Sequence, residues 1–587
     1  MDANPSDVAV PPARHPVDLV GLTIFAAAGI AVYLRLFYGL DLTDDSFYVG
    51  LPYAFALGHR PFVDELATHQ FAGLLLLPAV KAYLGVVGSN TGLVLFARHL
   101  YFAASLSSAL LARDTLSEIF GRRAGNLAAA SSLGFIPFLL PSLSYNTIAC
   151  LGMLAGTMLL ASACLPGRSP MRLGFGVVCV ALASFAYPPV LVAAIVALLL
   201  GLAGFCFVRE SELRRKAFII VSAAGLSAGA AALALIHQYD GFAQLERLAD
   251  LNAAFAVQGG GLEKLSLILG EFVLQSHYLI ALLAVSFVVL SGVRWIRQPR
   301  AAAAAAALIG PALLAVEFLF YLPHREPFTT VPFVLMALGV FSPVGVWLVR
   351  GRLSRNECIA LLVISVSSIT GAAIVLWATA NGLRNAALGI LPAYLVTLGC
   401  IALLRPRNFP RSSFVFAAFA ASLLVFQIFQ IWTHVYRDRP IWELTTTIDR
   451  GAWSGIRTTE AKKTFVETFE DDLAKARGDA KTVLFMDYFP AGYLLSDLRP
   501  RTPAIWLFPW NKTQQGNRAI REVYARGFPD PASLPDILVL VNCFPTHSML
   551  SIPLQQNDPV ALRMVEGNYQ RAITRDCYVI SKPRQVK

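Results

Sequence analysis

Long apolar runs, each of about 20 residues, recur along the first three quarters of the chain, between residues 17 and 433. A run of that length forms a helix long enough to cross a hydrocarbon layer of about 30 Å. The pattern therefore predicts a polytopic α-helical membrane protein. About 13 transmembrane helices are predicted, at roughly 17–37, 93–111, 125–141, 147–165, 173–187, 190–208, 217–236, 278–293, 301–320, 331–349, 357–377, 386–404 and 413–433.

The pattern changes after the last run. Residues 434–587 are mixed in charge and contain a predicted helix near 459–477. Short β-branched runs at 482–486, 537–541 and 577–580, bounded by Pro, Asp and Gly, are typical of strands. About 150 residues suffice for one small domain, so a C-terminal α/β domain is predicted.

Composition and charge agree with a membrane location and give an orientation. Of the 587 residues, 56% are hydrophobic and only 14% are charged, against roughly a quarter in a soluble protein. Lys and Arg gather in alternate short loops, near 112–123, 166–172, 209–216, 294–300, 350–355 and 405–411. Because basic loops stay in the cytoplasm, the tail 1–16 is predicted to be cytoplasmic and the C-terminal domain to lie outside the inner membrane.

One apolar stretch, 70–87, does not fit as a crossing. Counting it would place Arg122 and Arg123 outside and invert every later loop. We therefore expect it to be a helix lying at the outer interface. Within the predicted membrane domain 17–433, this leaves 38–92 as one large extracytoplasmic loop and 237–277 as a second. The net charge of +11 then reflects orientation, and no nucleic-acid partner is expected.

The first outer loop carries the candidate chemistry. Asp44 and Asp45 follow the first predicted helix directly, and acids beside a bilayer are costly, which suggests a functional site. The alternative is that the two acids only cap the helix that follows. Paired acids serve base catalysis and metal binding equally well, so a divalent metal ion at Asp44 and Asp45 stays open. The sequence identifies no other cofactor, and no CxxC or HExxH spacing is present.

The loop motif resembles a known superfamily. The segments DDSFY at 44–48, ALG at 56–58, RPFVD at 60–64 and HQFAG at 69–73 are similar to the first-loop signature of the GT-C glycosyltransferases. The similarity is greatest to the protein O-mannosyltransferase and lipid A aminoarabinose transferase branch. The helix count and exported tail, including FPAGY at 489–493, also fit that branch.

The resemblance implies an inverting transfer of a hexosyl or pentosyl group from a polyprenyl-phosphate donor at the outer face. The acceptor is a lipid, a glycan or a protein. Asp44 matches the first acid of the family pair and is the predicted general base. Asp45 stands where Glu is usual and is expected to orient Asp44 or a metal ion.

Other candidate residues follow from the same resemblance. His69 matches a polar position near the donor phosphate, and Tyr48 is a candidate for stacking on the sugar. Arg60, Arg325 and Arg384 are outer-face cations available to a phosphodiester.

One position departs from the family pattern. Several relatives carry a second acid where this chain has Asn146, so the amide is expected to bind a sugar hydroxyl. A second acid would then come from elsewhere, such as Asp240 or Glu246.

Two further expectations complete the prediction. Cys543 and Cys577 are the only cysteines of the exported segment, where oxidising conditions favour a disulfide. Two other protein classes also handle lipid-linked sugars: a transporter or flippase, and a polysaccharide ligase or polymerase. The first places charges in mid-helix and the second relies on a late outer loop, whereas the acids here gather in the first loop.

Overall fold

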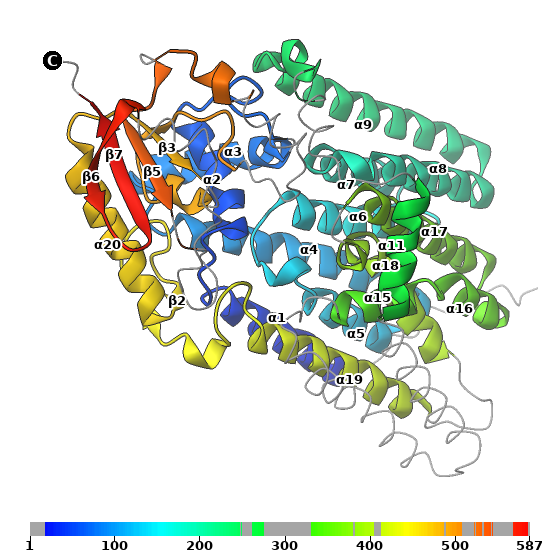
Figure 1. Ribbon diagram of the computed structural model, residues 1–587. Coiled ribbons are helices and arrows are strands. Elements are labelled where there is room, and N and C mark those ends of the chain that lie inside the picture. The colour runs from blue at the N-terminus through cyan, green and yellow to red at the C-terminus, as the bar shows by residue number, and fades with distance from the viewer. Residues whose placement is uncertain are drawn as a thin grey trace, which may run out of the picture.

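The computed structural model describes residues 18–67, 69–246, 248, 261–274, 330–379, 382–403, 412–486, 489–506, 522, 524–530, 533–541, 543 and 567–584. Within these residues a bundle of long helices lies beside a smaller part that contains a β-sheet (Figure 1). Helices α2 (Asp44–Ala56) and α3 (Gln70–Val87) lie where the two parts meet (Figure 1).

Most helices of the bundle are apolar and run side by side. By length and composition, 7 helices among the described residues can cross a membrane, or 8 if one bent pair is a single crossing. The protein is therefore a multi-pass membrane protein. The bundle comprises α1 (Leu19–Arg35), α4 (Leu93–Phe120), α5 (Arg122–Leu133), α6 (Tyr145–Ser162), α7 (Met171–Ala186), α8 (Leu191–Val208), α9 (Ser211–Gln238), α11 (Gly261–Leu274), α15 (Thr330–Gly339), α16 (Ser342–Val349), α17 (Arg355–Ala378), α18 (Leu383–Leu403) and α19 (Ser412–Thr433).

The predicted helix 331–349 is broken. It forms α15 and α16, which meet at an angle of 43°. Pro343 lies in the first turn of α16, and proline has no N–H to continue the hydrogen bonds of a preceding helix. The predicted helix 125–141 is also shorter than expected, because α5 ends at Leu133 before the 3₁₀ turn Pro137–Leu139. The predicted crossings 278–293 and 301–320 lie outside the described residues.

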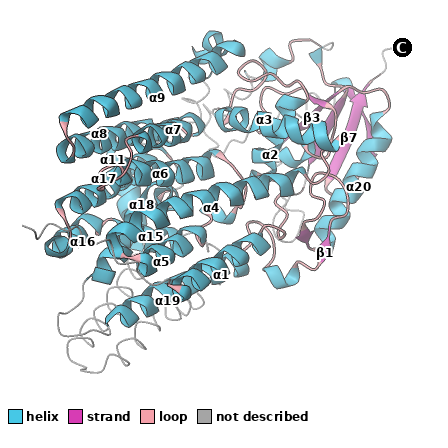
Figure 2. Cartoon of the chain, turned by 180° about the vertical axis from the view of Figure 1, so that it is seen from behind, coloured by secondary structure: helices cyan, strands magenta, loops and turns pink. Residues whose placement is uncertain are grey.

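The C-terminal part is built on a five-stranded sheet of order β4-β3-β5-β7-β6. Strand β3 pairs in parallel with β4 and β5, while β7 pairs antiparallel with β5 and β6. Helix α20 lies along the sheet (Figure 2), and a disulfide joins Cys543 after β5 to Cys577 before β7. The bounds are β3 (Thr482–Met486), β4 (Arg499–Pro500), β5 (Ile537–Val541), β6 (Tyr569–Thr574), β7 (Tyr578–Pro583) and α20 (Glu460–Arg477), with a separate pair of β1 (Thr446–Thr447) and β2 (Arg457–Thr458).

The loop between α1 and α4 and the C-terminal segment share one hydrophobic core. Phe47 and Leu51 of α2 belong to the same buried cluster as Trp453, Phe469 and Phe485 of the C-terminal segment. The sequence changes character at residue 434, but the packing unit combines residues from both sides of that boundary. The conformation of the loop therefore depends on its packing against the C-terminal segment.

Both ends of α3 contact the C-terminal segment. Before the helix, Leu66 N–H donates to Pro503 O at 3.1 Å. After it, Asn90 Nδ2 donates to Leu494 O at 2.8 Å, and Gly92 N–H donates to Gly451 O at 3.0 Å. The helix is apolar and long enough to cross a membrane, and residues next to both of its ends are hydrogen-bonded to the C-terminal segment.

Candidate active site

Asp44 is the first residue of α2 and meets two side chains from the segment that follows α19. Tyr436 donates its hydroxyl to Asp44 Oδ2 at 2.7 Å, and Arg437 Nη1 lies 3.0 Å from the same oxygen. The Asp44 side chain remains 15% exposed and that of Arg437 13% exposed. Asp44 is therefore a carboxylate that is held by the protein and still open to solvent.

Asp45 points into a different environment. Its Oδ2 forms a 2.6 Å ion pair with Arg98 Nη2, and both side chains are buried. Arg98 also donates to the backbone oxygens of Leu36 and Gly39, each at 2.7 Å. Asp45 thus fastens the start of the loop to α4.

The acid pair does not fit a shared metal ion. Asp44 and Asp45 each face a different guanidinium, and a cation in that place competes with a metal for the carboxylate oxygens. Among the described residues, no group of three or more His, Cys, Asp or Glu side chains is arranged to hold a metal ion.

A buried ion pair holds the segment that carries Arg437. Asp438 accepts hydrogen bonds from Leu40 N–H at 2.7 Å and Thr458 Oγ1 at 2.8 Å, and Lys462 Nζ lies 3.4 Å from its other oxygen. Arg437 itself has a φ of +50°, a conformation that costs a residue with a side chain of order 1–3 kcal/mol. The contacts of Asp438 keep Arg437 in this conformation against Asp44.

The carboxylate of Asp41, in the turn before α2, caps the N-terminus of this helix. Asp41 is buried and its carboxylate accepts from the backbone N–H groups of Thr43 at 3.1 Å and Asp45 at 2.8 Å. Burial raises the pKa of Asp41 to about 6. The capping role that the sequence left open for Asp44 and Asp45 is therefore performed by Asp41.

Aromatic rings line the neighbourhood of Asp44. The ring of Tyr48 lies 5.7 Å from that of Tyr145, at the start of α6. Tyr145 in turn lies 4.4 Å from His69 and 5.3 Å from Tyr187. Burial, together with Tyr145 and the negative charge of Asp44, raises the pKa of Tyr48 well above its usual value, so its hydroxyl remains a proton donor.

His69 is a neutral group in this setting. It precedes α3 and contacts the rings of Phe47 and Tyr145. Burial lowers the pKa of His69 to about 4. At neutral pH it therefore offers hydrogen bonds, and no positive charge, to a ligand.

Two polar residues of the bundle lie at the same end. Asn146 is buried beside Tyr145 at the start of α6, and none of the described residues donates to its Oδ1. Arg384, in the first turn of α18, lies within electrostatic range of Tyr436 and Glu271.

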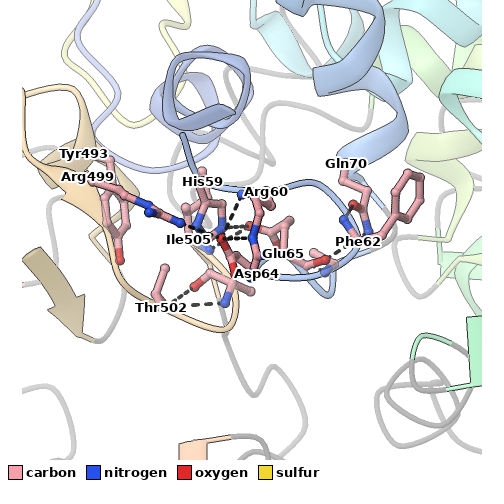
Figure 3. A network of polar contacts seen from close by, with 12 residues as sticks. His59, Arg60, Phe62, Asp64, Glu65, Gln70, Tyr493, Arg499, Thr502 and Ile505 are labelled. Carbon is pink, nitrogen blue, oxygen red and sulfur yellow. Dashed lines mark hydrogen bonds and ion pairs between the residues drawn. The ribbon is translucent and has the colours of Figure 1, made fainter. Parts of the chain in front are cut away.

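Arg60 belongs to another network, drawn in Figure 3. Its Nη2 lies 3.1 Å from Asp64 Oδ1, and its side chain is 62% exposed. Asp64 also pairs with Arg499 at 3.2 Å, so this network ties the loop to the C-terminal segment. Asp240, one of the alternative second acids, lies within electrostatic range of Arg60.

The centre of this second network is buried. His59 Nε2 lies 3.3 Å from Glu65 Oε2, and both side chains are inaccessible to solvent. The same carboxylate oxygen accepts from Ile505 N–H at 3.0 Å, and Gln70 Oε1 accepts from Phe62 N–H at 2.6 Å. These contacts fix the turn between α2 and α3 and thereby the position of His69.

The structure brings together some of the predicted residues and separates others. Asp44, Tyr48, His69, Asn146 and Arg384 lie in one region, whereas Asp45 and Arg60 serve other contacts. Arg325 lies outside the described residues.

Tyr436 and Arg437 were not predicted from the sequence. The available signal was the charged stretch RDR at 437–439, which follows the last predicted crossing directly and is predicted to lie at the same membrane face as the first loop.

A pocket of about 530 Å³ lies between α2, the end of α3 and the C-terminal segment. Its lining includes Tyr53, Asn90, Glu470 and Asp497 and contains none of the predicted site residues. The candidate site is therefore defined by the contacts of Asp44 rather than by this pocket.

Comparisons with known proteins place these features beside solved structures. No protein-family model matches the chain, and no curated protein sequence matches it. The structure of ArnT from Cupriavidus metallidurans in the apo state is similar over 95% of this chain and 97% of its own, with 11% identity and a TM-score of 0.45. The same protein bound to undecaprenyl phosphate is similar over 97% and 99%, with 12% identity and a TM-score of 0.41.

An archaeal structure is also similar. The oligosaccharyltransferase from Archaeoglobus fulgidus, tethered to an acceptor peptide, is similar over 94% of this chain and 72% of its own, with 12% identity and a TM-score of 0.42.

Proposed function

We propose that this protein is an inverting membrane glycosyltransferase that moves a monosaccharide from a polyprenyl-phosphate donor to an acceptor hydroxyl at the outer face of the inner membrane. The observation that supports this most directly is the state of Asp44. It is a partly exposed carboxylate, oriented by Tyr436 and Arg437, at the membrane face that the charge pattern assigns to the outside.

The proposed site draws on helix ends that are far apart in the sequence. The end of α1, the starts of α6 and α18 and the segment after α19 all contribute residues near Asp44. The topology predicted from the basic loops assigns each of these ends to the outer side. A lipid-linked donor reaches such a site from the bilayer, with its tail among the helices and its phosphate at their ends.

In the proposed reaction Asp44 is the general base. The acceptor oxygen attacks the anomeric carbon, its proton passes to Asp44, and the bond between that carbon and the phosphate oxygen breaks. The polyprenyl phosphate leaves with the bonding electrons and therefore gains negative charge. A positioned base of this kind typically contributes a factor of about 100 to 10,000 to the rate.

In the proposed reaction Arg437 interacts with both the Asp44 carboxylate and the donor phosphate. Without donor it neutralises Asp44 across 3.0 Å. A bound phosphate next to Arg437 shares the guanidinium, which can donate to two groups at once, and this leaves Asp44 with fewer donors competing for the acceptor proton's place. Arg384 supplies further positive charge from α18, while Asn146, Tyr48 and the neutral His69 offer hydrogen bonds and ring faces to the sugar.

The test is transfer by the purified full-length protein in nanodiscs. Undecaprenyl-phosphate mannose, glucose and aminoarabinose, each carrying a radiolabelled sugar, are offered together with a membrane extract of the source cells as acceptor. We expect transfer from at least one donor and a loss of at least about 100-fold in Asp44→Asn. Asp64→Asn is the matched control, because Asp64 is an acid of the same loop that pairs with Arg60 and Arg499.

Two results would overturn the proposal. Full activity in Asp44→Asn removes the base assignment. Failure to use any lipid-phosphate donor, combined with movement of these lipids across vesicle membranes, identifies a flippase instead.

A further inference from the structure

Two asparagines with buried carbonyl oxygens lie at the end of the bundle that meets α2. Asn146 is the second residue of α6 and Asn385 is the third residue of α18, and these two helices pack against each other. The two residues are 3% and 1% exposed, and none of the described residues donates a hydrogen bond to either Oδ1. The amide nitrogen of Asn385, by contrast, donates to Thr379 Oγ1 at 2.8 Å.

Other buried side-chain amides of the bundle and the first loop do have a donor at their oxygen. The Oδ1 of Asn126 and the Oε1 of Gln70 and of Gln427 each accept a hydrogen bond, at 2.6, 2.6 and 2.8 Å. Within the described part of the chain, the two asparagines are thus the buried side-chain amides whose oxygen lacks a donor. A buried acceptor without a donor is costly, so the pair calls for a donor from outside the chain.

The helix starts do not need these two side chains. Helix α6 is capped by Ser144, whose side chain accepts from Thr147 N–H. At the start of α18, Leu383 N–H donates to a carboxylate oxygen of Glu271 at 2.9 Å. The capping function that often explains an asparagine in a first turn is therefore performed by other residues.

Tyrosine rings connect both amides to the candidate site. Tyr145 directly precedes Asn146, and the side chain of Tyr187 interacts with that of Asn385. The two rings lie 5.3 Å apart and are partly exposed, and Tyr145 also contacts His69. A ligand at the site reaches the amides by displacing a tyrosine side chain, a common change on binding that leaves the backbone in place.

The chemistry of an amide oxygen restricts the ligand. It only accepts hydrogen bonds, so it matches a hydroxyl or amine group and not the oxygens of an ionised phosphate, which are acceptors themselves. The residue before Asn385 is Arg384, and its positive charge disfavours an ammonium group at the same place. Neutral hydroxyl groups remain, and they are the donors that a sugar ring carries at several positions.

We propose that Asn146 and Asn385 select the donor sugar by accepting one hydroxyl hydrogen each. The substrate class is then a neutral sugar with hydroxyl groups at two positions of its ring. This inference rests on the proposed glycosyl transfer and adds the sugar selectivity of its site. A donor that lacks one of the two hydroxyl groups leaves an amide oxygen buried and unpaired, which weakens its binding by about 5- to 150-fold.

The experiment measures donor binding to the full-length protein in nanodiscs by native mass spectrometry. Undecaprenyl phosphate is compared with undecaprenyl-phosphate glucose and undecaprenyl-phosphate mannose. The hexose donor that binds more tightly is then compared with its analogues that each lack one ring hydroxyl. We expect the sugar donor to bind more tightly than undecaprenyl phosphate, and two of the analogues to lose about 5- to 150-fold in affinity.

Variants assign each hydroxyl group to an amide. Leucine is close to asparagine in size and lacks the amide oxygen, so Asn146→Leu and Asn385→Leu should each weaken the sugar donor by the same factor. Neither change should alter the affinity for undecaprenyl phosphate. Each variant should also become insensitive to the loss of one hydroxyl group, which is the signature of a direct contact in a double-mutant cycle.

Asn126→Leu is the matched control. This buried amide lies in α5 and accepts from Arg113 Nε at 2.6 Å, so its loss removes a hydrogen bond that exists without ligand. Asn126→Leu should lower the melting temperature more than Asn146→Leu or Asn385→Leu. Its ratio of affinities for the sugar donor and undecaprenyl phosphate should equal that of the wild type.

Three outcomes overturn the inference and leave the proposed transfer standing. Equal weakening of the sugar donor and undecaprenyl phosphate in the Asn146 and Asn385 variants assigns the amides a structural role. Full affinity of all the analogues in the wild type removes hydroxyl recognition. Tighter binding of undecaprenyl-phosphate aminoarabinose than of both neutral donors assigns the site to an amine. If no lipid phosphate binds at all, the proposed function fails together with the inference.

Discussion

Asp45 and Arg98 form a 2.6 Å ion pair in which both side chains are buried. The adjacent Asp44 forms its own ion pair with Arg437 and stays partly exposed. The two neighbouring acids of the motif therefore have different roles, and substituting each one separately is expected to have different effects.

Asp45→Asn is expected to destabilise the protein strongly. The change leaves the buried Arg98 charge without its partner, which costs about 3–5 kcal/mol in comparable cases. Asp44→Asn is expected to cost no more than about 1 kcal/mol, because its pair is partly exposed. Thermal unfolding in detergent, followed by tryptophan fluorescence, measures both; equal destabilisation would contradict the division of roles.

Arg437→Gly separates strain from charge. Glycine adopts a φ of +50° without penalty, and this gain offsets part of the stability that is lost with the contact to Asp44, so the variant should remain folded. It should nevertheless bind undecaprenyl phosphate about 10- to 100-fold more weakly, the range of one lost charge-assisted hydrogen bond. Arg439→Gly, two residues away and half-exposed, is the control, and Arg437→Lys should recover part of the affinity.

The pH dependence should show that His69 is neutral. Its pKa in the folded protein is lowered to about 4 from an ordinary 6.5. Below pH 6.5 the unfolded chain therefore binds a proton that the folded chain does not, and the stability from this group falls as the pH drops toward 4. His69→Gln should remove that part of the slope in unfolding experiments. Transfer rates between pH 6.5 and 8 should have the same profile in both proteins, and a change in shape within that range would show that His69 is charged.

Reduction of the disulfide should destabilise the C-terminal part. Cys543 and Cys577 are 34 residues apart, and a closed loop of this length contributes about 3–4 kcal/mol. Hydrogen exchange of β5 and β7 should speed up after treatment with dithiothreitol. The Cys543→Ser/Cys577→Ser double variant should match the reduced protein and no longer respond to the reagent.

Much of the fold follows from local sequence pattern. The helix near 459–477 and the strands at 482–486 and 537–541 coincide with α20, β3 and β5, because amphipathic and β-branched periodicity is read from neighbouring residues. The break at Gly339 was missed because hydropathy alone ignores the proline that follows.

The different roles of Asp44 and Asp45 depend on contacts with residues that are distant in the sequence. Asp44 and Asp45 look equivalent in the sequence, and only the distant Arg98 and Arg437 distinguish them. The sequence also suggested that Arg60 binds the donor phosphate. In the folded chain Arg60 instead pairs with Asp64, which also pairs with the distant Arg499. Tyr436 and Arg437 lie some 390 residues from Asp44 and became visible as its partners only in three dimensions.

The shared core of the first loop and the C-terminal segment has a consequence for biosynthesis. About 350 residues separate the two halves of this core, so at roughly 5–20 residues per second the loop between α1 and α4 waits for some tens of seconds before its partner segment is made. During that interval Phe47, Leu51 and the other apolar side chains of α2 lack the surface that covers them. Folding of the first loop is therefore completed only after the C-terminal segment has been synthesised. Truncation after α19 removes this segment and with it the surface against which the first loop packs.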